Sequence, residues 1–220
     1  MERRKMLGLI TAATASFGGL LAVNERKSSD SGSLAIPVKR SPHPIKRGKG
    51  TLVVYFSKTG KNYPDLDIKV GNTAQIARFI HDRVDGDTFE IVPARPYPAD
   101  YDQTVEQAQR EESRSIFPAT KSVMPDTDQY STIFLGHPVW WGEQPMVVQT
   151  FMRDRDLSYG TIVPFVTHEG SGFGNSLDVL GQYYPKARVL DGFSARGTAV
   201  HTNPGNARRE VNAWLEGLGF

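Results

Sequence analysis

From Thr51 onward, short apolar runs alternate with segments of helical periodicity, and this alternation constrains the fold more than any other feature of the sequence. Leu52–Phe56 is continuously apolar, which is typical of a strand buried on both faces. Residues 73–84 then repeat apolar side chains at helical spacing. Further strands are predicted at 88–92, 132–136, 161–167 and 187–190, and further helices near 145–153, 173–182 and 206–217. This rhythm predicts an α/β fold with a parallel sheet covered by helices on both faces.

The loop after the first predicted strand is divided into two parts. In a parallel sheet, ligands bind outside the carboxyl ends of the strands, so the loops after strands one, three and four should meet at one site. Ser57–Gly60 and Gly71–Thr73 read as two halves of one turn, separated by residues 61–70. Hydroxyls, glycines and the start of a helix favour a phosphate group there. The spacing is that of neither a Walker loop nor a Gly-x-Gly-x-x-Gly turn, and an ordinary polar loop with a threonine N-cap is the alternative.

The loops after the third and fourth strands are rich in aromatic residues and glycine. The loop 136–145 holds two adjacent tryptophans, Trp140 and Trp141, between glycines and prolines. Both rings cannot be packed into the core, and a large exposed aromatic is costly unless it meets a flat partner. The loop 167–174 is glycine-rich, so its backbone can approach a ligand closely. Together the three loops suit a flat, phosphorylated aromatic ligand, and FMN fits that description.

The three loops, in this order, resemble those of the flavodoxin-like family. The similarity is strongest to a bacterial branch with a Trp-Trp-Gly loop and a Thr-His-Glu-Gly-Ser-Gly-Phe-Gly loop, and it covers residues 51–218. The resemblance implies a three-layer fold with a five-stranded parallel sheet in the order 2-1-3-4-5. It also implies that residues 51–220 form one domain with FMN as its cofactor.

The resemblance carries specific site residues. It implies phosphate contacts from the divided loop, by Ser57, Thr59, Gly60, Asn72 and Thr73. It implies contacts to the flavin ring from the other two loops, by Pro138, Trp140, Trp141 and Gly142 on one side and Thr167, His168, Glu169, Gly170, Gly172 and Phe173 on the other. The ten inserted residues are compatible with phosphate binding, because the entropy of loop closure grows only slowly with length.

His168 is the one candidate for a catalytic group. A histidine has a suitable pKa to donate a proton to reduced flavin or to a quinone above it. The alternative is structural: His168 hydrogen-bonds the loop backbone, and Glu169 is solvated or caps the next helix. The remaining histidines share no spacing typical of metal ligands, so no metal site is predicted.

Composition excludes several classes of protein. The chain has no cysteine, which rules out disulfides, thiol catalysis and Cys-ligated metals. Residues 1–50 carry 10 Lys and Arg against 3 Asp and Glu, whereas residues 51–220 carry 16 against 21. The basic charge therefore belongs to the N-terminal part, and the acidic domain is not expected to bind nucleic acid.

The N-terminus is predicted to be a targeting segment. A twin-arginine start at Arg3 and Arg4 precedes an apolar stretch of small residues that is too weakly hydrophobic for a comfortable membrane span. We expect residues 1–30 to be a twin-arginine-type signal, residues 31–50 to be a linker, and the protein to be exported to the periplasm or beyond. An uncleaved membrane anchor is the alternative, and no span is expected in the mature domain.

Three functions fit these features. The first is an electron-transfer flavoprotein that acts between redox partner proteins. The second is an FMN-dependent quinone or NAD(P)H oxidoreductase with a quinone-like small molecule as partner, although no nicotinamide-binding motif is recognisable. The third is a flavodoxin-fold binding protein without flavin.

Overall fold

The structure is a computed structural model that describes residues 50–121, 123 and 125–220. The predicted signal or anchor (1–30) and nearly all of the predicted linker (31–50) lie outside the described residues. Within the part of the chain that is described, no helix is both long and apolar enough to cross a membrane.

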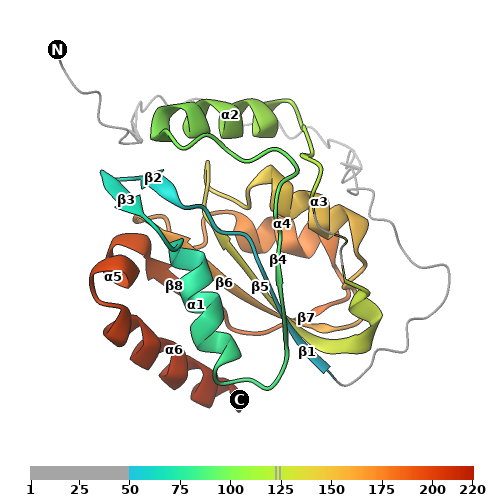
Figure 1. Ribbon diagram of the computed structural model, residues 1–220. Coiled ribbons are helices and arrows are strands. Elements are labelled where there is room, and N and C mark those ends of the chain that lie inside the picture. The colour runs from blue at the N-terminus through green and yellow to red at the C-terminus, as the bar shows by residue number, and fades with distance from the viewer. Residues whose placement is uncertain (1–49, 122, 124) are drawn as a thin grey trace, which may run out of the picture. The chain divides into compact units, whose positions relative to one another are not determined.

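The core of the domain is a parallel sheet in the predicted order. Its strands are β4 (Asp87–Glu90), β1 (Gly50–Tyr55), β5 (Tyr130–Pro138), β6 (Thr161–His168), β7 (Arg188–Val189) and β8 (Phe193–Arg196). The order β4-β1-β5-β6-β7 corresponds to 2-1-3-4-5, with β8 also paired to β6 (Figure 1). The fifth position is thus shared by two short strands. The gap between them faces Pro164 of β6, which has no N–H group to donate to a neighbouring strand.

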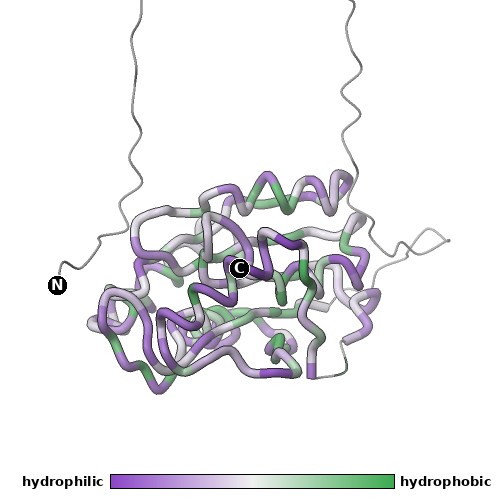
Figure 2. Tube along the Cα trace, turned by 90° about the horizontal axis from the view of Figure 1, so that it is seen from above, coloured by the Kyte–Doolittle hydropathy of each residue, from purple (hydrophilic) through white to green (hydrophobic). Residues whose placement is uncertain are grey.

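Helices cover both faces of this sheet, as predicted for a three-layer α/β fold (Figure 1). The helices are α1 (Asn72–His81), α2 (Tyr101–Ser113), α3 (Met146–Asp154), α4 (Ser176–Tyr183), α5 (Gly197–Thr202) and α6 (Pro204–Leu218), with a 3₁₀ turn η1 at Thr127–Gln129. One apolar core joins α1, α5 and α6 to the sheet, and a second joins α3 and α4 to its other face. In Figure 2, hydrophobic and hydrophilic residues alternate along the outer helices, as expected when one side of a helix faces a core.

The helix α2 was not predicted from the sequence. Its buried side chains are Thr104, Ala108 and Glu111, so it carries little of the apolar pattern that marks a helix. Polar contacts hold it instead: the Tyr97 hydroxyl donates to the Glu111 carboxylate at 2.7 Å, and Gln107 donates to the other carboxylate oxygen at 2.8 Å. A buried carboxylate needs such donors to offset its lost hydration.

The insertion between the two halves of the divided loop is a β-hairpin. It comprises β2 (Gly60–Asn62) and β3 (Leu66–Ile68), with Lys61 opposite Asp67 and a 3.4 Å ion pair between them. The Lys61 amide donates to the Ala99 carbonyl at 3.1 Å, which attaches the hairpin to the segment before α2. The two halves of the loop meet at its base, since a side-chain carbon at Gly71 would overlap Oγ of Ser57.

Gly136 of β5 gives a test of the core. A side-chain carbon at this position would overlap the ring of buried Phe165 on β6. We therefore expect Gly136→Ala to lower the free energy of unfolding by about 1–3 kcal/mol, measured by urea denaturation. Gly181 of α4 is the control: no neighbouring atom lies near its missing side chain, so Gly181→Ala should raise stability by about 0.5–1 kcal/mol. An unaltered midpoint for Gly136→Ala would contradict the packing described here.

Candidate functional site

The two halves of the divided loop lie together at the N-terminus of α1. The helix has no capping side chain at Gly71, and Oγ of Ser57 accepts a hydrogen bond from the Ala74 amide at 3.1 Å instead. The amides of Asn72 and Thr73 precede Ala74 in the first turn, where a helix has no carbonyl partners for its N–H groups. This geometry presents the positive end of a helix beside hydroxyl groups, as an anion site requires.

The threonines predicted to contact phosphate differ in exposure. Thr73 is buried, and its hydroxyl lies 2.7 Å from the hydroxyl of Thr167, so this side chain joins the first loop to the third. Thr59 is exposed, and its hydroxyl forms no hydrogen bond with any other described residue. Oδ1 of Asn72 is a buried acceptor, and it also has no hydrogen-bond partner among the residues that the structure describes. An exposed hydroxyl and an unsatisfied acceptor fit a ligand that carries both phosphate and hydroxyl groups.

Trp141 is at the tip of a two-residue turn. Trp140 and Glu143 exchange both backbone hydrogen bonds, at 3.0 and 3.1 Å, and the two residues between them have positive φ angles, 52° for Trp141 and 89° for Gly142. These are the angles of a type I′ hairpin turn, and they are rare for a bulky residue. Trp141 remains 43% exposed, and its Nε1 donates to the Val105 carbonyl of α2 at 3.4 Å. Backbone strain of this kind persists at sites where a side chain must be held in one place.

Trp140 occupies a different environment from Trp141. Its ring packs edge-on against Phe56, with centroids 5.4 Å apart, and against Tyr97, with centroids 4.9 Å apart. It also borders the apolar core beneath α3 and α4. Trp140 therefore closes the core, while Trp141 presents a partly open aromatic face.

Hydrogen bonds join the tryptophan turn to the third loop. The Gly142 carbonyl accepts from the Asn175 amide at 2.6 Å, and a side-chain carbon at Gly174 would overlap that carbonyl group. The Val139 amide donates to the Thr167 carbonyl at 2.9 Å. The structure thus brings the second and third loops together, and the Thr73–Thr167 bond adds the first. Asn175 could not be predicted from the sequence, because it makes this contact through its backbone amide, which every residue except proline has.

His168 and Glu169 make structural contacts. Nδ1 of His168 accepts a hydrogen bond from the Gly170 amide at 2.8 Å, in an assignment that places the proton on Nε2. Burial lowers the pKa of His168, nearby Glu169 opposes this, and Arg196 lowers it further. The Glu169 carboxylate accepts from the amide and the hydroxyl of Thr198, at 2.6 and 2.8 Å, and so caps α5. The His168 contact is that of the structural alternative, whereas Glu169 caps α5 and not the next helix in sequence, α4. A catalytic role for His168 stays a prediction.

The other residues predicted to contact the ring lie at strand ends or in the glycine loop. Pro138 ends β5, and Gly170 and Gly172 have φ angles of 133° and 59° that favour glycine. Phe173 lies against Gly192 in the link between β7 and β8, where a side-chain carbon would overlap its ring. Phe173 therefore packs at the sheet edge beside β6, on the opposite side of this strand from the Trp140–Glu143 turn.

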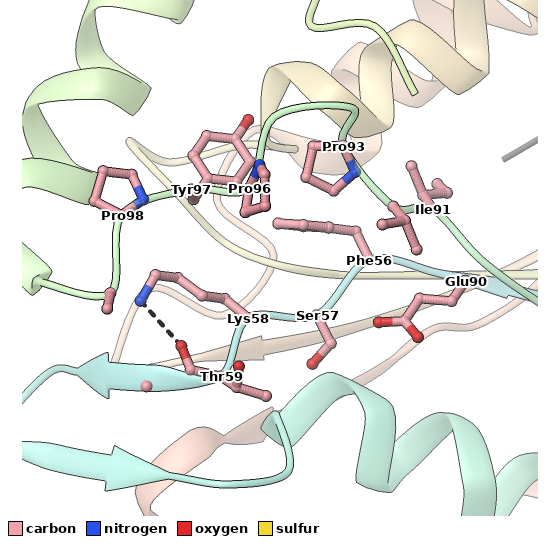
Figure 3. Close-up of a pocket in the computed structure, with 13 residues that line it drawn as sticks. Phe56, Ser57, Lys58, Thr59, Glu90, Ile91, Pro93, Pro96, Tyr97 and Pro98 are labelled. Atoms are coloured by element: carbon pink, nitrogen blue, oxygen red, sulfur yellow. Dashed lines mark hydrogen bonds between the residues drawn. The ribbon is translucent and has the colours of Figure 1, made fainter. Parts of the chain in front are cut away.

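A cavity of about 320 Å³ adjoins the divided loop on its β4 side. In Figure 3, the rings of Pro93, Pro96 and Pro98 lie across this cavity from Ser57 and Lys58. Neither tryptophan of the second loop and no residue of the third loop lines it. The Lys58 ammonium turns back to the carbonyls of Thr59 and Lys61, at 3.1 and 2.9 Å. Lys58 therefore stabilises the loop and the base of the hairpin. Among the described residues, no group of three His, Asp or Glu side chains could hold a metal ion.

His137, the residue before Pro138 in β5, makes stability depend on pH. Burial lowers the pKa of His137 from 6.5 to about 4, against a weaker opposing hydrogen bond from Nδ1–H to the Pro138 carbonyl. The folded state therefore favours the neutral ring, and its contribution to stability is complete above pH 6.5 and is lost as pH falls toward 4. We expect the free energy of unfolding to fall by about 3 kcal/mol more in the wild type than in His137→Gln between pH 7.5 and 4. If the free energy of unfolding falls equally with pH in both proteins, the pKa of His137 is the same in the folded and the unfolded state, and this prediction is wrong.

The comparisons with known proteins agree with this geometry. A family model described as Flavodoxin matches residues 51–218. A candidate flavoprotein from Bacteroides uniformis is 30% identical with a TM-score of 0.62, and the match covers 77% of this chain and 99% of that one. A similar protein from Bacteroides eggerthii is 29% identical with a TM-score of 0.60, covering 79% and 99%.

A more distant structure shares the fold. It is a flavoprotein from Lactobacillus acidophilus in complex with FMN, 21% identical with a TM-score of 0.54, covering 70% of this chain and 98% of that one. No curated protein matches the sequence. The family model spans the whole domain, from the first strand of the sheet to the end of α6. On this evidence, the chain belongs to the flavodoxin family.

Proposed function

We propose that this domain binds FMN and transfers electrons between partners through it. The observation that carries the proposal is the convergence of three loops at the carboxyl ends of β1, β5 and β6, in a domain that belongs to the flavodoxin family. The structure of a relative in complex with FMN supports the same cofactor. When bound, FMN supplies a ring that accepts and releases electrons, and the protein supplies binding, orientation and electrostatics.

In this proposal the divided loop holds the phosphate group. The Thr59 hydroxyl and the amides of Asn72 and Thr73 donate to its oxygens, and the positive end of α1 favours its charge. Ser57 keeps the helix end in place through its bond to Ala74. Oδ1 of Asn72 accepts a hydrogen bond from a ligand hydroxyl.

The ring is held by the second and third loops. The face of Trp141 stacks on it, because this tryptophan is the exposed one and its turn is fixed by the Trp140–Glu143 pair. The backbone of residues 167–172 borders the ring on the other side, fixed by the bonds of Thr167 and Glu169. Rigid loops of this kind keep the surroundings of the ring unchanged while its charge changes.

The charge of the domain supports an electron carrier that meets protein partners. Residues 51–220 carry five more acidic than basic side chains, which steers encounters toward basic surfaces. We also propose that the protein is exported, on the basis of Arg3 and Arg4 at the start of the chain.

The decisive experiment is to purify the protein from a flavin-replete host, extract its cofactor and assay NAD(P)H oxidation with a quinone. Release of FMN without such turnover, together with rapid reduction by a one-electron donor, supports the carrier. Steady turnover of NAD(P)H would favour the oxidoreductase. A colourless protein that takes up no FMN would rule out both and leave the flavin-free binding protein.

Thr59→Val tests the phosphate contact. Removing a hydrogen bond to a charged group should weaken FMN binding by about 1–3 kcal/mol, while riboflavin, which has no phosphate, should bind as to the wild type. Both affinities can be measured by quenching of flavin fluorescence. Because Thr59 is exposed and its hydroxyl bonds no described residue, the melting temperature of the flavin-free protein should not change. Equal losses for FMN and riboflavin would place Thr59 away from the phosphate.

Replacing each of the two tryptophans by alanine should have a different effect. Trp141→Ala should weaken FMN, restore flavin fluorescence and raise the midpoint potential of the oxidised flavin, because an electron-rich face favours the oxidised ring. Trp140→Ala should instead lower the free energy of unfolding by about 1–3 kcal/mol, because its partly buried ring packs against Phe56 and Tyr97 at the edge of a core. Wild-type potential and quenching in Trp141→Ala would show that the ring lies elsewhere.

A further inference from the structure

A second cavity, of about 440 Å³, lies on the α1 and α5 side of the inserted hairpin. Its walls come from β3 and the residues after it, from α1 and from the last turn of α5. The lining residues are Asp67, Lys69, Val70, Gln75, Arg78 and His201. None of the residues proposed to hold FMN lines this cavity, which we call the basic cleft.

The basic cleft is positively charged in a domain that is acidic as a whole. Lys69 and Arg78 have no carboxylate partner among the residues that the structure describes. The one carboxylate of the lining, Asp67, is already paired with Lys61 across the hairpin at 3.4 Å. His201 adds an imidazole to the lining, and no acidic side chain from α1 or α5 lines the cleft. Two unpaired cations that face one cavity are the charge pattern of an anion site.

The donors come from separate elements, so they can surround a ligand. Gln75 and Arg78 are three residues apart on α1 and therefore share one face of this helix. The Arg78 guanidinium lies 5.5 Å from the centroid of the Phe79 ring, an aromatic contact that orients the planar group. Lys69 approaches from the hairpin side and His201 from the end of α5. The planar guanidinium of Arg78, with its several N–H donors, and the ammonium of Lys69 together match the oxygens of a phosphate group.

We propose that the basic cleft binds a second, phosphate-bearing small molecule of nucleotide or pyrophosphate type, distinct from FMN. The volume is within the range of ligand sites, and it exceeds what a single phosphate group fills. The proposal gives the insertion a role: residues 61–70 supply Asp67, Lys69 and Val70, which form one wall of the site. Without the hairpin, α1 and α5 would present Gln75, Arg78 and His201 on an open surface.

The test uses protein saturated with FMN, so that the phosphate loop is already filled. Titration calorimetry with pyrophosphate, and separately with ADP, should show one site in the wild type. The double variant Lys69→Gln/Arg78→Gln should bind either probe at least tenfold more weakly. Tighter binding of ADP than of pyrophosphate would identify a nucleotide, and equal binding would identify a simple polyanion.

A matched control separates the site from general charge effects. Lys186→Gln/Arg209→Gln removes the same two charges from exposed positions outside the cleft and should leave both affinities within twofold of the wild type. If the control loses as much affinity as the cleft variant, or if neither probe binds the wild type at millimolar concentration, the proposal is wrong.

Deleting residues 61–70 supplies an independent outcome. Since Gly71 touches Ser57 at the base of the hairpin, the deletion should leave FMN affinity within about threefold of the wild type. It should at the same time abolish binding of pyrophosphate. Retained pyrophosphate affinity in a deletion variant that still binds FMN would show that the hairpin is not part of the site.

Discussion

The parallel register of β1, β5 and β6 is the constraint on which the candidate site depends. Tyr55, the last residue of β1, lies opposite Gly136, and Gly136 lies opposite Phe165. The strands β5 and β6 therefore extend two and three residues beyond this level, to Pro138 and His168, in the same direction. Everything that follows them, the divided loop, the tryptophan turn and the glycine loop, is therefore delivered to one edge of the sheet. A shift of one strand by one residue would move each of its side chains to the opposite face of the sheet, into the wrong apolar core, and would separate these loops.

In addition to the strand register, a few hydrogen bonds join the three loops into one unit. Thr73 joins the first loop to the third, the Gly142 carbonyl joins the second to the third, and Glu169 fixes the third to the start of α5. Two of these bonds are between side chains, and the third holds the turn that strains Trp141 into a positive φ angle. Less conformational entropy is lost on binding when a site is already ordered, and these hydrogen bonds hold the loops in place in the ligand-free protein.

Most of the sheet could be predicted from the sequence, because buried parallel strands leave continuous apolar runs such as Leu52–Phe56. The elements that were missed carry no such signal. The helix α2 is held by Tyr97 and the Glu111 carboxylate instead of an apolar stripe, and the hairpin is too short and polar for a pattern. The difference between Trp140 and Trp141 depends on Phe56 and Tyr97, which are distant in sequence, so neighbouring identical residues could not be told apart. Similarly, the cations of the basic cleft are separated along the chain and meet only after folding.

The hairpin leaves and re-enters the domain at almost one point, where Gly71 meets Ser57. Such a point of attachment is modular. The length and composition of the inserted segment can drift over generations while the loop beneath it stays closed, because doubling the length of a flexible insert changes the closure cost by only about 0.6 kcal/mol. A family built on one cofactor could thus diversify at this position, each member carrying a different appendage beside an unaltered redox centre, and the same position offers protein engineers a place to graft a recognition peptide next to the flavin.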